Sequence, residues 1–287
     1  MPASWLGGGT ADLTRAAFTA FAIALLAMPA LAAERVDLEL VLATDTSRSI
    51  DDSEARLQRG GVAAALRHPD IIQAIQSGYH KKIAAAYIDY SSANFNEIIV
   101  DWRIIKDAES ANTFARALIE TPLTFGRRTS NSDGLEMAAS MIENNQYLGT
   151  RRVIDVAGDG PNNYGRLVED VRDDIVNKGI SINGLPIISN GDEGFASQFS
   201  INDLDDYYRG CVIGGRGAFI VVARDFPDFA RAIRRKLIFE IALGGSEPQL
   251  LHRVQGGRRA FGGYVYKPGC DIGERLWLRR FSDPDND

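Results

Sequence analysis

Three small oxygen-bearing side chains, Asp45, Ser47 and Ser49, stand at alternate positions directly after an apolar run that begins at Val36. The run carries acidic residues only near its start, which is typical of a strand buried on both faces of a parallel sheet. The loop after such a strand is where ligands bind in doubly wound sheets. One carboxylate and two hydroxyls there would supply half of the coordination shell of a hard cation such as Mg2+. Asp and Ser are also preferred helix N-caps, so a capping loop is the alternative interpretation.

Two further oxygen-bearing residues are expected at the same edge of the sheet. Thr129 lies in a loop that leads into a predicted helix, and Asp159 follows the end of a predicted strand. With Asp45, Ser47 and Ser49 they make five candidate metal ligands, none of which offers nitrogen or sulfur. That set suits Mg2+, Mn2+ or Ca2+ and disfavours zinc. Because two carboxylates do little more than neutralise a divalent cation, we expect the ion to accept one more anionic oxygen from outside.

Predicted strands and helices alternate along most of the chain, which indicates an α/β fold: a three-layer α/β/α sandwich around a doubly wound, mostly parallel sheet. The strands are predicted at residues 36–42, 82–90, 96–101, 151–157, 179–188 and 218–223. The helices are predicted at residues 51–67, 70–77, 107–120, 133–144, 166–177, 201–208 and 226–243. In such a fold the loops after the strands gather at one edge of the sheet, where the candidate ligands would meet.

These residues resemble the von Willebrand factor type A domain and its metal-ion-dependent adhesion site (MIDAS). The resemblance rests on the segment Asp45-Thr46-Ser47-Arg48-Ser49 after the first strand, on Thr129 in a later loop, and on Asp159-Gly160 at a strand end. It covers residues 36–243, and the chain is similar in particular to the exported, uncharacterised bacterial branch of the family (DUF1194-type). The resemblance implies a Rossmann-like fold and a binding module whose cation coordinates an Asp or Glu of a protein partner.

The loop around the candidate threonine departs from the family pattern. The family's threonine usually follows Gly-Gly, whereas Arg127 and Arg128 precede Thr129 here. In the family, those glycines let the loop close tightly. Because this loop lacks them, Ser130 and Ser132 are alternative ligands to Thr129. The arginines would also place positive charge beside the site.

A second departure is Asp155, which lies inside the strand that precedes Asp159, where family members usually carry an apolar residue. A buried carboxylate needs hydrogen-bonding partners. We therefore expect Asp155 to have a structural role and not to bind the metal.

The composition and the first residues indicate an exported protein. A chain of 287 residues with 45% hydrophobic content accommodates one sizeable α/β domain plus an appendage, and its net charge of −6 argues against a nucleic-acid partner. Residues 1–32 have the order of a secretory signal peptide: Arg15, an apolar run over 16–29, and Ala30-Leu31-Ala32. We expect a periplasmic or secreted protein that has no membrane span after signal cleavage.

The C-terminal extension, residues 244–287, is rich in glycine and arginine and is expected either to form a small hairpin or to be largely disordered.

The two cysteines, Cys211 and Cys270, leave two alternatives open. They form one disulfide in an oxidising compartment, or Cys211 is buried and Cys270 is a free thiol.

A metal-dependent protein-binding module is the function that this set of residues favours, and three arginines, Arg48, Arg127 and Arg128, would direct its open coordination position toward an acidic partner. A phosphotransferase or hydrolase with Asp45 as nucleophile is the alternative enzyme. Ser47, however, occupies the position of the second Asp in haloacid-dehalogenase-like enzymes, and no general acid is evident. The histidines are scattered along the chain, at positions 68, 80 and 252. We therefore expect a protein that is not an enzyme; a metal-free structural scaffold is the third interpretation.

Overall fold

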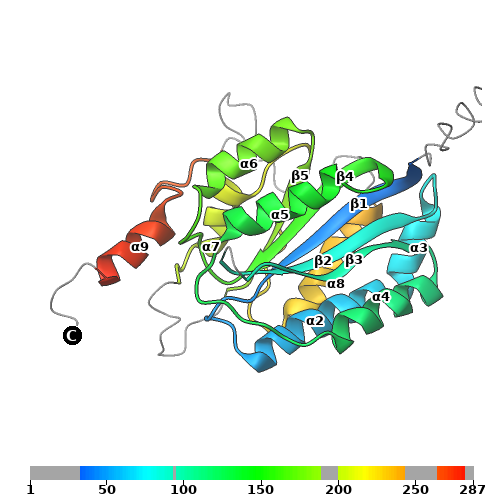
Figure 1. The fold of residues 1–287 in the computed structure, drawn as a ribbon, viewed down its shortest axis with the longest axis horizontal. Coiled ribbons are helices and arrows are strands. Elements are labelled where there is room, and N and C mark those ends of the chain that lie inside the picture. Colours follow the sequence, from blue (N-terminus) through cyan, green and yellow to red (C-terminus); the bar gives the residue numbers. More distant parts are fainter. Residues whose placement is uncertain (1–32, 93–94, 189–199, 243–263, 282–287) are drawn as a thin grey trace, which may run out of the picture. The chain divides into compact units, whose positions relative to one another are not determined.

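A five-stranded sheet in the order β3-β2-β1-β4-β5 forms the centre of the protein (Figure 1). The computed structural model describes residues 33–92, 95–188, 200–242 and 264–281, so the predicted signal peptide lies outside the described residues. The strands are β1 (Glu34–Asp45), β2 (Ile83–Tyr90), β3 (Glu97–Ile105), β4 (Tyr147–Gly158) and β5 (Ser181–Pro186). All neighbouring strands in this sheet are parallel except β2 and β3. The predicted α/β fold with a mostly parallel sheet is confirmed.

The middle strand, β1, is buried because it has neighbours on both sides and helices on both faces. Val41 is paired with Ala86 of β2 and with Ile154 of β4, and all three side chains are fully buried. After β1, the chain forms β2 and β3 on one side of β1, and then forms β4 and β5 on the other side of β1. The ends of β1 and β4 therefore form the switch point of the sheet, the place where doubly wound folds bind ligands.

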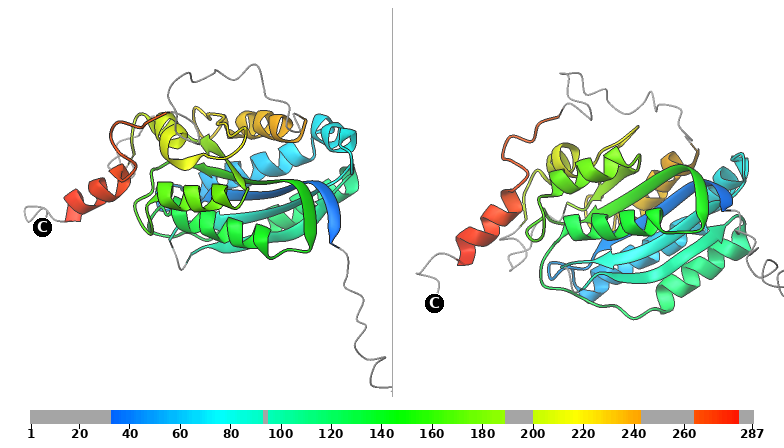
Figure 2. Two further views of the ribbon diagram at one scale, coloured as in Figure 1. Left: turned by 90° about the horizontal axis from the view of Figure 1, so that it is seen from above. Right: turned by 45° about the horizontal axis from the view of Figure 1, so that its top comes forward.

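Helices cover the two faces of the sheet (Figure 2). One apolar core joins the sheet to α2 (Asp52–Leu66), α3 (Pro69–Ser77), α4 (Ala108–Glu120) and α8 (Phe229–Ala242). A second core, on the other face, joins it to α5 (Asn131–Glu143), α6 (Val168–Asn177), α7 (Leu204–Tyr207) and the adjoining π-helical turn η2 (Tyr208–Val212). Of the helices among the described residues, none has the length and apolar character needed to span a bilayer.

The structure corrects the prediction of a last strand at residues 218–223. This segment makes only isolated bridges to β5 and its end, at the pairs Gly184–Ile220 and Ile187–Ala223. Pro186 lies between these two pairs and has no N–H to donate, which interrupts the hydrogen-bond ladder. The expected helix at 201–208 is likewise shorter, since α7 covers four residues before the π-helical turn begins.

Residues 264–281 of the C-terminal extension form no hairpin and end in a helix, α9 (Ile272–Phe281). The hairpin or disorder expected for the rest of the extension lies outside the described residues. Cys211 and Cys270 form a disulfide with their Cα atoms 5.5 Å apart, which decides between the two alternatives for the cysteines.

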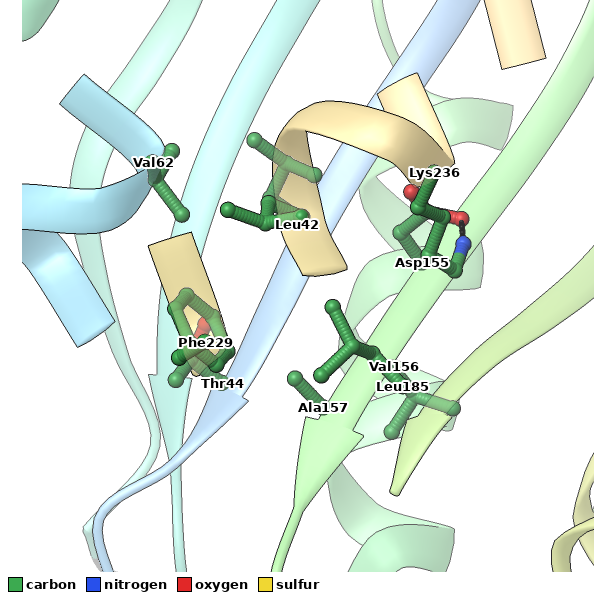
Figure 3. A pocket seen from close by; sticks show the side chains of 10 residues that line it. Leu42, Thr44, Val62, Asp155, Val156, Ala157, Leu185, Phe229 and Lys236 are labelled. Carbon is green, nitrogen blue, oxygen red and sulfur yellow. Dashed lines mark hydrogen bonds and ion pairs between the residues drawn. The ribbon is translucent and has the colours of Figure 1, made fainter. Parts of the chain in front are cut away.

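Asp155 has the structural role expected of it. Its carboxylate pairs with Lys236 of α8, whose side chain is fully buried, and the two line a small cavity between β4 and α8 (Figure 3). Glu240, one turn further along α8, accepts hydrogen bonds from Arg151 at 2.9 Å and from Asn183. This buried ionic cluster fixes α8 on the face of β4 and β5, because each charge has its partner on the other element.

Candidate metal centre

The five predicted ligands come from three loops at the carboxyl edge of the sheet. Asp45 is the last residue of β1, and Ser47 and Ser49 lie in the turn between β1 and α2. Thr129 precedes α5, and Asp159 directly follows β4. Thr44 of β1 pairs with Ala157 of β4, so the ends of these two strands lie side by side.

The helix caps are supplied by other residues, which removes the capping interpretation of the first loop. Asp51 caps α2, accepts hydrogen bonds from the main-chain N–H groups of Ser53 and Glu54, and forms a capping box with Glu54. Ser130 caps α5 by accepting a hydrogen bond from the N–H of Asp133. The hydroxyls of the predicted metal ligands are therefore not needed as caps.

A chain of hydrogen bonds connects the side chains of four of the five predicted ligands. Thr129 Oγ1 donates to Ser47 Oγ at 3.0 Å, Ser47 Oγ lies 3.1 Å from Ser49 Oγ, and Ser49 Oγ donates to Asp159 Oδ1 at 2.8 Å. Because Ser49 gives its proton to Asp159, the hydrogen bond between the serines must run from Ser47 to Ser49. Each serine oxygen accepts one bond and donates one, which leaves one lone pair for another ligand.

Asp45, the fifth predicted ligand, is fully buried and only half satisfied. Its Oδ1 accepts a hydrogen bond from the N–H of Ser47 at 2.7 Å. Its Oδ2 is buried and has no hydrogen-bond partner among the described residues. A buried carboxylate oxygen without a partner is costly, and a cation at that oxygen would relieve the cost. The residues present therefore fit a hard divalent cation.

The electrostatics of the two carboxyl groups point in the same direction. Burial, with the charge of Asp159 as the second cause, raises the pKa of Asp45 well above its usual range. Burial also raises the pKa of Asp159 to about 6; the hydrogen bond from Ser49 opposes this rise and the nearby charge of Glu54 adds to it. Without a cation the site thus disfavours two ionised carboxylates, and a divalent cation would reverse that preference.

Thr129 and the two alternative serines make different contacts. Ser130 Oγ and Ser132 Oγ both donate to the carbonyl of Tyr164, at 2.9 and 3.3 Å, while Thr129 Oγ1 reaches Ser47. The loop closes tightly through Gly126, three residues before Thr129. A Cβ at Gly126 would lie 2.1 Å from Ser91 Oγ, so only glycine permits this approach.

Sequence reasoning missed the side chains that hold these loops together. Asn163 Oδ1 accepts a hydrogen bond from the N–H of Thr129 at 3.1 Å, and its own N–H donates to the carbonyl of Thr129 at 2.9 Å. Asn162 Oδ1 accepts one from the N–H of Ser132 at 3.0 Å. The available signal was the adjacent asparagine pair after Asp159, because an amide side chain offers both a donor and an acceptor to a neighbouring main chain.

The two arginines before Thr129 differ in their surroundings. Arg127 is exposed, whereas Arg128 is half-buried. The Arg128 guanidinium carbon lies 3.8 Å from the ring centroid of Trp277 and 5.1 Å from that of Tyr164, and burial lowers its pKa. Arg128 is therefore packed between aromatic rings as well as being a charge beside the site.

The fold is shared with solved structures of low sequence identity. The pilus adhesin SpaC from Lactobacillus rhamnosus GG is 12% identical with a TM-score of 0.52, over 72% of this chain and 31% of SpaC. Proximal thread matrix protein 1 (PTMP1) from the mussel byssus, in a structure with a zinc-occupied MIDAS motif, is 11% identical with a TM-score of 0.51, over 73% of this chain and 49% of PTMP1. The chain thus corresponds to less than half of either protein, and the likeness shows the fold.

The search of the curated proteins found no match. The family model described as "Protein of unknown function (DUF1194)" matches residues 35–244, which include every predicted metal ligand. The chain therefore belongs to the DUF1194 family, as its sequence predicted.

Proposed function

We propose that this protein is an exported binding module in which a single divalent cation recruits an acidic side chain of a partner protein. The cation is held by Asp45, Ser47, Ser49, Thr129 and Asp159. The observation that carries the proposal is the buried, unpartnered Oδ2 of Asp45 beside a chain of hydroxyl groups that ends at Asp159.

Mg2+ or Mn2+ is the expected ion, and Ca2+ is the next candidate, because all five donors are hard oxygens. The zinc in the MIDAS motif of the PTMP1 structure supports a divalent cation in a related fold, and zinc therefore belongs among the ions to be tested. A cation bound by two carboxylates and neutral hydroxyls keeps affinity for a further anionic oxygen. An Asp or Glu of a partner would supply it.

A binding role agrees with the groups that surround the site. The residues within hydrogen-bonding reach of the predicted ligands offer hydroxyls, amides and main-chain groups. Of the described histidines, His68 caps α3 and His80 precedes β2, so both belong to loops at the opposite end of the sheet. We therefore propose that Asp45 binds a metal and does not act as the nucleophile of a phosphotransferase or hydrolase.

Export to the periplasm or the cell exterior is part of the proposal. The disulfide between Cys211 and Cys270 supports an oxidising compartment, where such bonds persist. SpaC, an adhesin, and PTMP1, a matrix protein, support a role in binding other proteins.

The first prediction concerns metal binding. Isothermal titration of the folded protein with Mn2+ or Mg2+ should give one site, and Asp45→Ala and Asp159→Ala should abolish binding because each removes a charged ligand. Ser47→Ala should weaken binding less, since a neutral hydroxyl contributes less field at the ion. Asp52→Ala, an exposed residue of α2 that pairs with Arg56, is the matched control and should bind like the unmodified protein. A folded protein without binding at millimolar metal would contradict the proposal.

The second prediction concerns pH in the absence of metal. The pKa of Asp159 is raised from 3.8 to about 6, so its protonated form stabilises the fold; this contribution is complete below pH 3.8 and is lost as the pH rises through about 6. From pH 4 to pH 7 in chelator, the free energy of unfolding should fall by about 2 kcal/mol more in the unmodified protein than in Asp159→Asn, which cannot titrate. Urea unfolding at each pH measures this difference. Equal pH profiles for the two proteins would show that burial does not raise the pKa of Asp159.

The third prediction concerns the partner. A protein captured on the immobilised module from an extracytoplasmic extract in Mg2+ should be released by EDTA and should not bind Asp45→Ala. Asp52→Ala should retain it. A partner that binds equally well in EDTA would use another surface, and the cation would then have a structural role only.

A further inference from the structure

Helix α9 lies beyond the segment matched by the family model, yet it is anchored beside the candidate metal centre. The disulfide at Cys270 fixes the chain two residues before α9 begins. Tyr266, shortly before the disulfide, donates a hydrogen bond to Asp203 at 2.9 Å and packs edge-on against Tyr207 with ring centroids 5.6 Å apart. These contacts hold the start of α9 against the end of the domain that carries the metal loops.

The first contact of α9 with those loops is made through Asn162. Glu274 accepts a hydrogen bond from the Asn162 side chain at 2.7 Å, and Asn162 in turn accepts one from the N–H of Ser132. A Cβ at Gly273 would lie 2.0 Å from the carbonyl oxygen of Asn162, so the α9 main chain rests directly on this loop. The neighbouring Asn163 exchanges two hydrogen bonds with the main chain of Thr129.

The second contact of α9 is with Arg128, the residue directly before Thr129. Trp277 covers its guanidinium at 3.8 Å. The Arg128 carbonyl accepts a hydrogen bond from Ser91 Oγ at 2.6 Å, which ties this stretch to the end of β2. The main chain of Thr129 thus bonds to Asn163 and adjoins Arg128. Helix α9 contacts Arg128 directly and contacts Asn162, the residue before Asn163.

We propose that α9 positions Thr129 for the metal, with Glu274 and Trp277 as the positioning residues; this inference rests on the metal site proposed above. The C-terminal extension constrains the loop from outside, because its two contacts hold Arg128, directly before Thr129, and Asn162, directly before the Asn163 that pairs with Thr129.

The experiment uses the chain without its predicted signal peptide, residues 33–287, and the variants Glu274→Ala and Trp277→Ala. Mn2+ affinity is measured by titration, and amide hydrogen exchange is measured separately in chelator. Each variant should bind Mn2+ about 10-fold more weakly, as expected for a residue that orients a metal ligand. In chelator, exchange should be faster at Thr129, Ser132 and Asn163 and unchanged in β1.

Three matched variants separate positioning from general stability. Glu274→Gln keeps the acceptor for Asn162, and Trp277→Phe keeps an aromatic face for Arg128, so both should restore metal affinity and protection of the loop. Arg279→Ala, an exposed residue on the same helix, should change neither.

The outcomes distinguish this inference from the metal site itself. If the unmodified chain binds Mn2+ and both alanine variants bind it equally well, α9 does not position the site, and only this inference is overturned. If the loop amides are unprotected to the same degree in all the proteins, it is overturned as well. If the folded, unmodified chain fails to bind Mn2+, the proposed function fails and takes the metal role of α9 with it.

Discussion

The burial of two carboxyl groups at one edge of the sheet is the constraint on which the site depends. Asp45 and Asp159 end up together because β1 and β4 are parallel neighbours whose carboxyl ends coincide. Burial and mutual repulsion make two ionised carboxylates unfavourable there. Asp45 accepts a hydrogen bond from the N–H of Ser47, and Asp159 accepts one from the hydroxyl of Ser49. The divalent cation proposed here would compensate both effects.

The remainder of the fold keeps these oxygens in place. Apolar packing on both faces fixes β1 and β4, and the buried pair of Asp155 and Lys236 holds α8 against β4. At the carboxyl edge of the sheet, main-chain groups of the Thr129 loop bond to Asn163 and Ser91. Residues distant in sequence therefore set the shape of that loop. Several elements therefore hold the loops of the candidate site, and α9 contacts two of these loops.

The sequence predicted the mostly parallel sheet and the meeting of the five candidate ligands at one of its edges, because both follow from local patterns: continuous apolar runs, and oxygen-bearing residues directly after strands. That these five residues bind a metal stays a prediction. It did not predict the hydrogen bonds of Asn162 and Asn163 to the Thr129 loop or the contacts of α9, since these join residues that are distant in sequence, such as Asn162 and Glu274. The prediction of a strand at 218–223 was wrong. It rested on the apolar residues of that segment and did not consider that Pro186, on the neighbouring strand, has no N–H to donate. The cysteines could not be paired from spacing alone; the observed bond requires their Cα atoms to lie 5.5 Å apart.

Anomalous diffraction from crystals grown with Mn2+ would locate the cation proposed at the unpartnered Oδ2 of Asp45. We expect one strong anomalous peak about 2.0–2.6 Å from this oxygen and within coordinating distance of the oxygens of Ser47 and Ser49. The peak should be absent from crystals of Asp45→Asn. An occupied manganese site elsewhere, or well-ordered crystals with no peak at this edge of the sheet, would contradict the account.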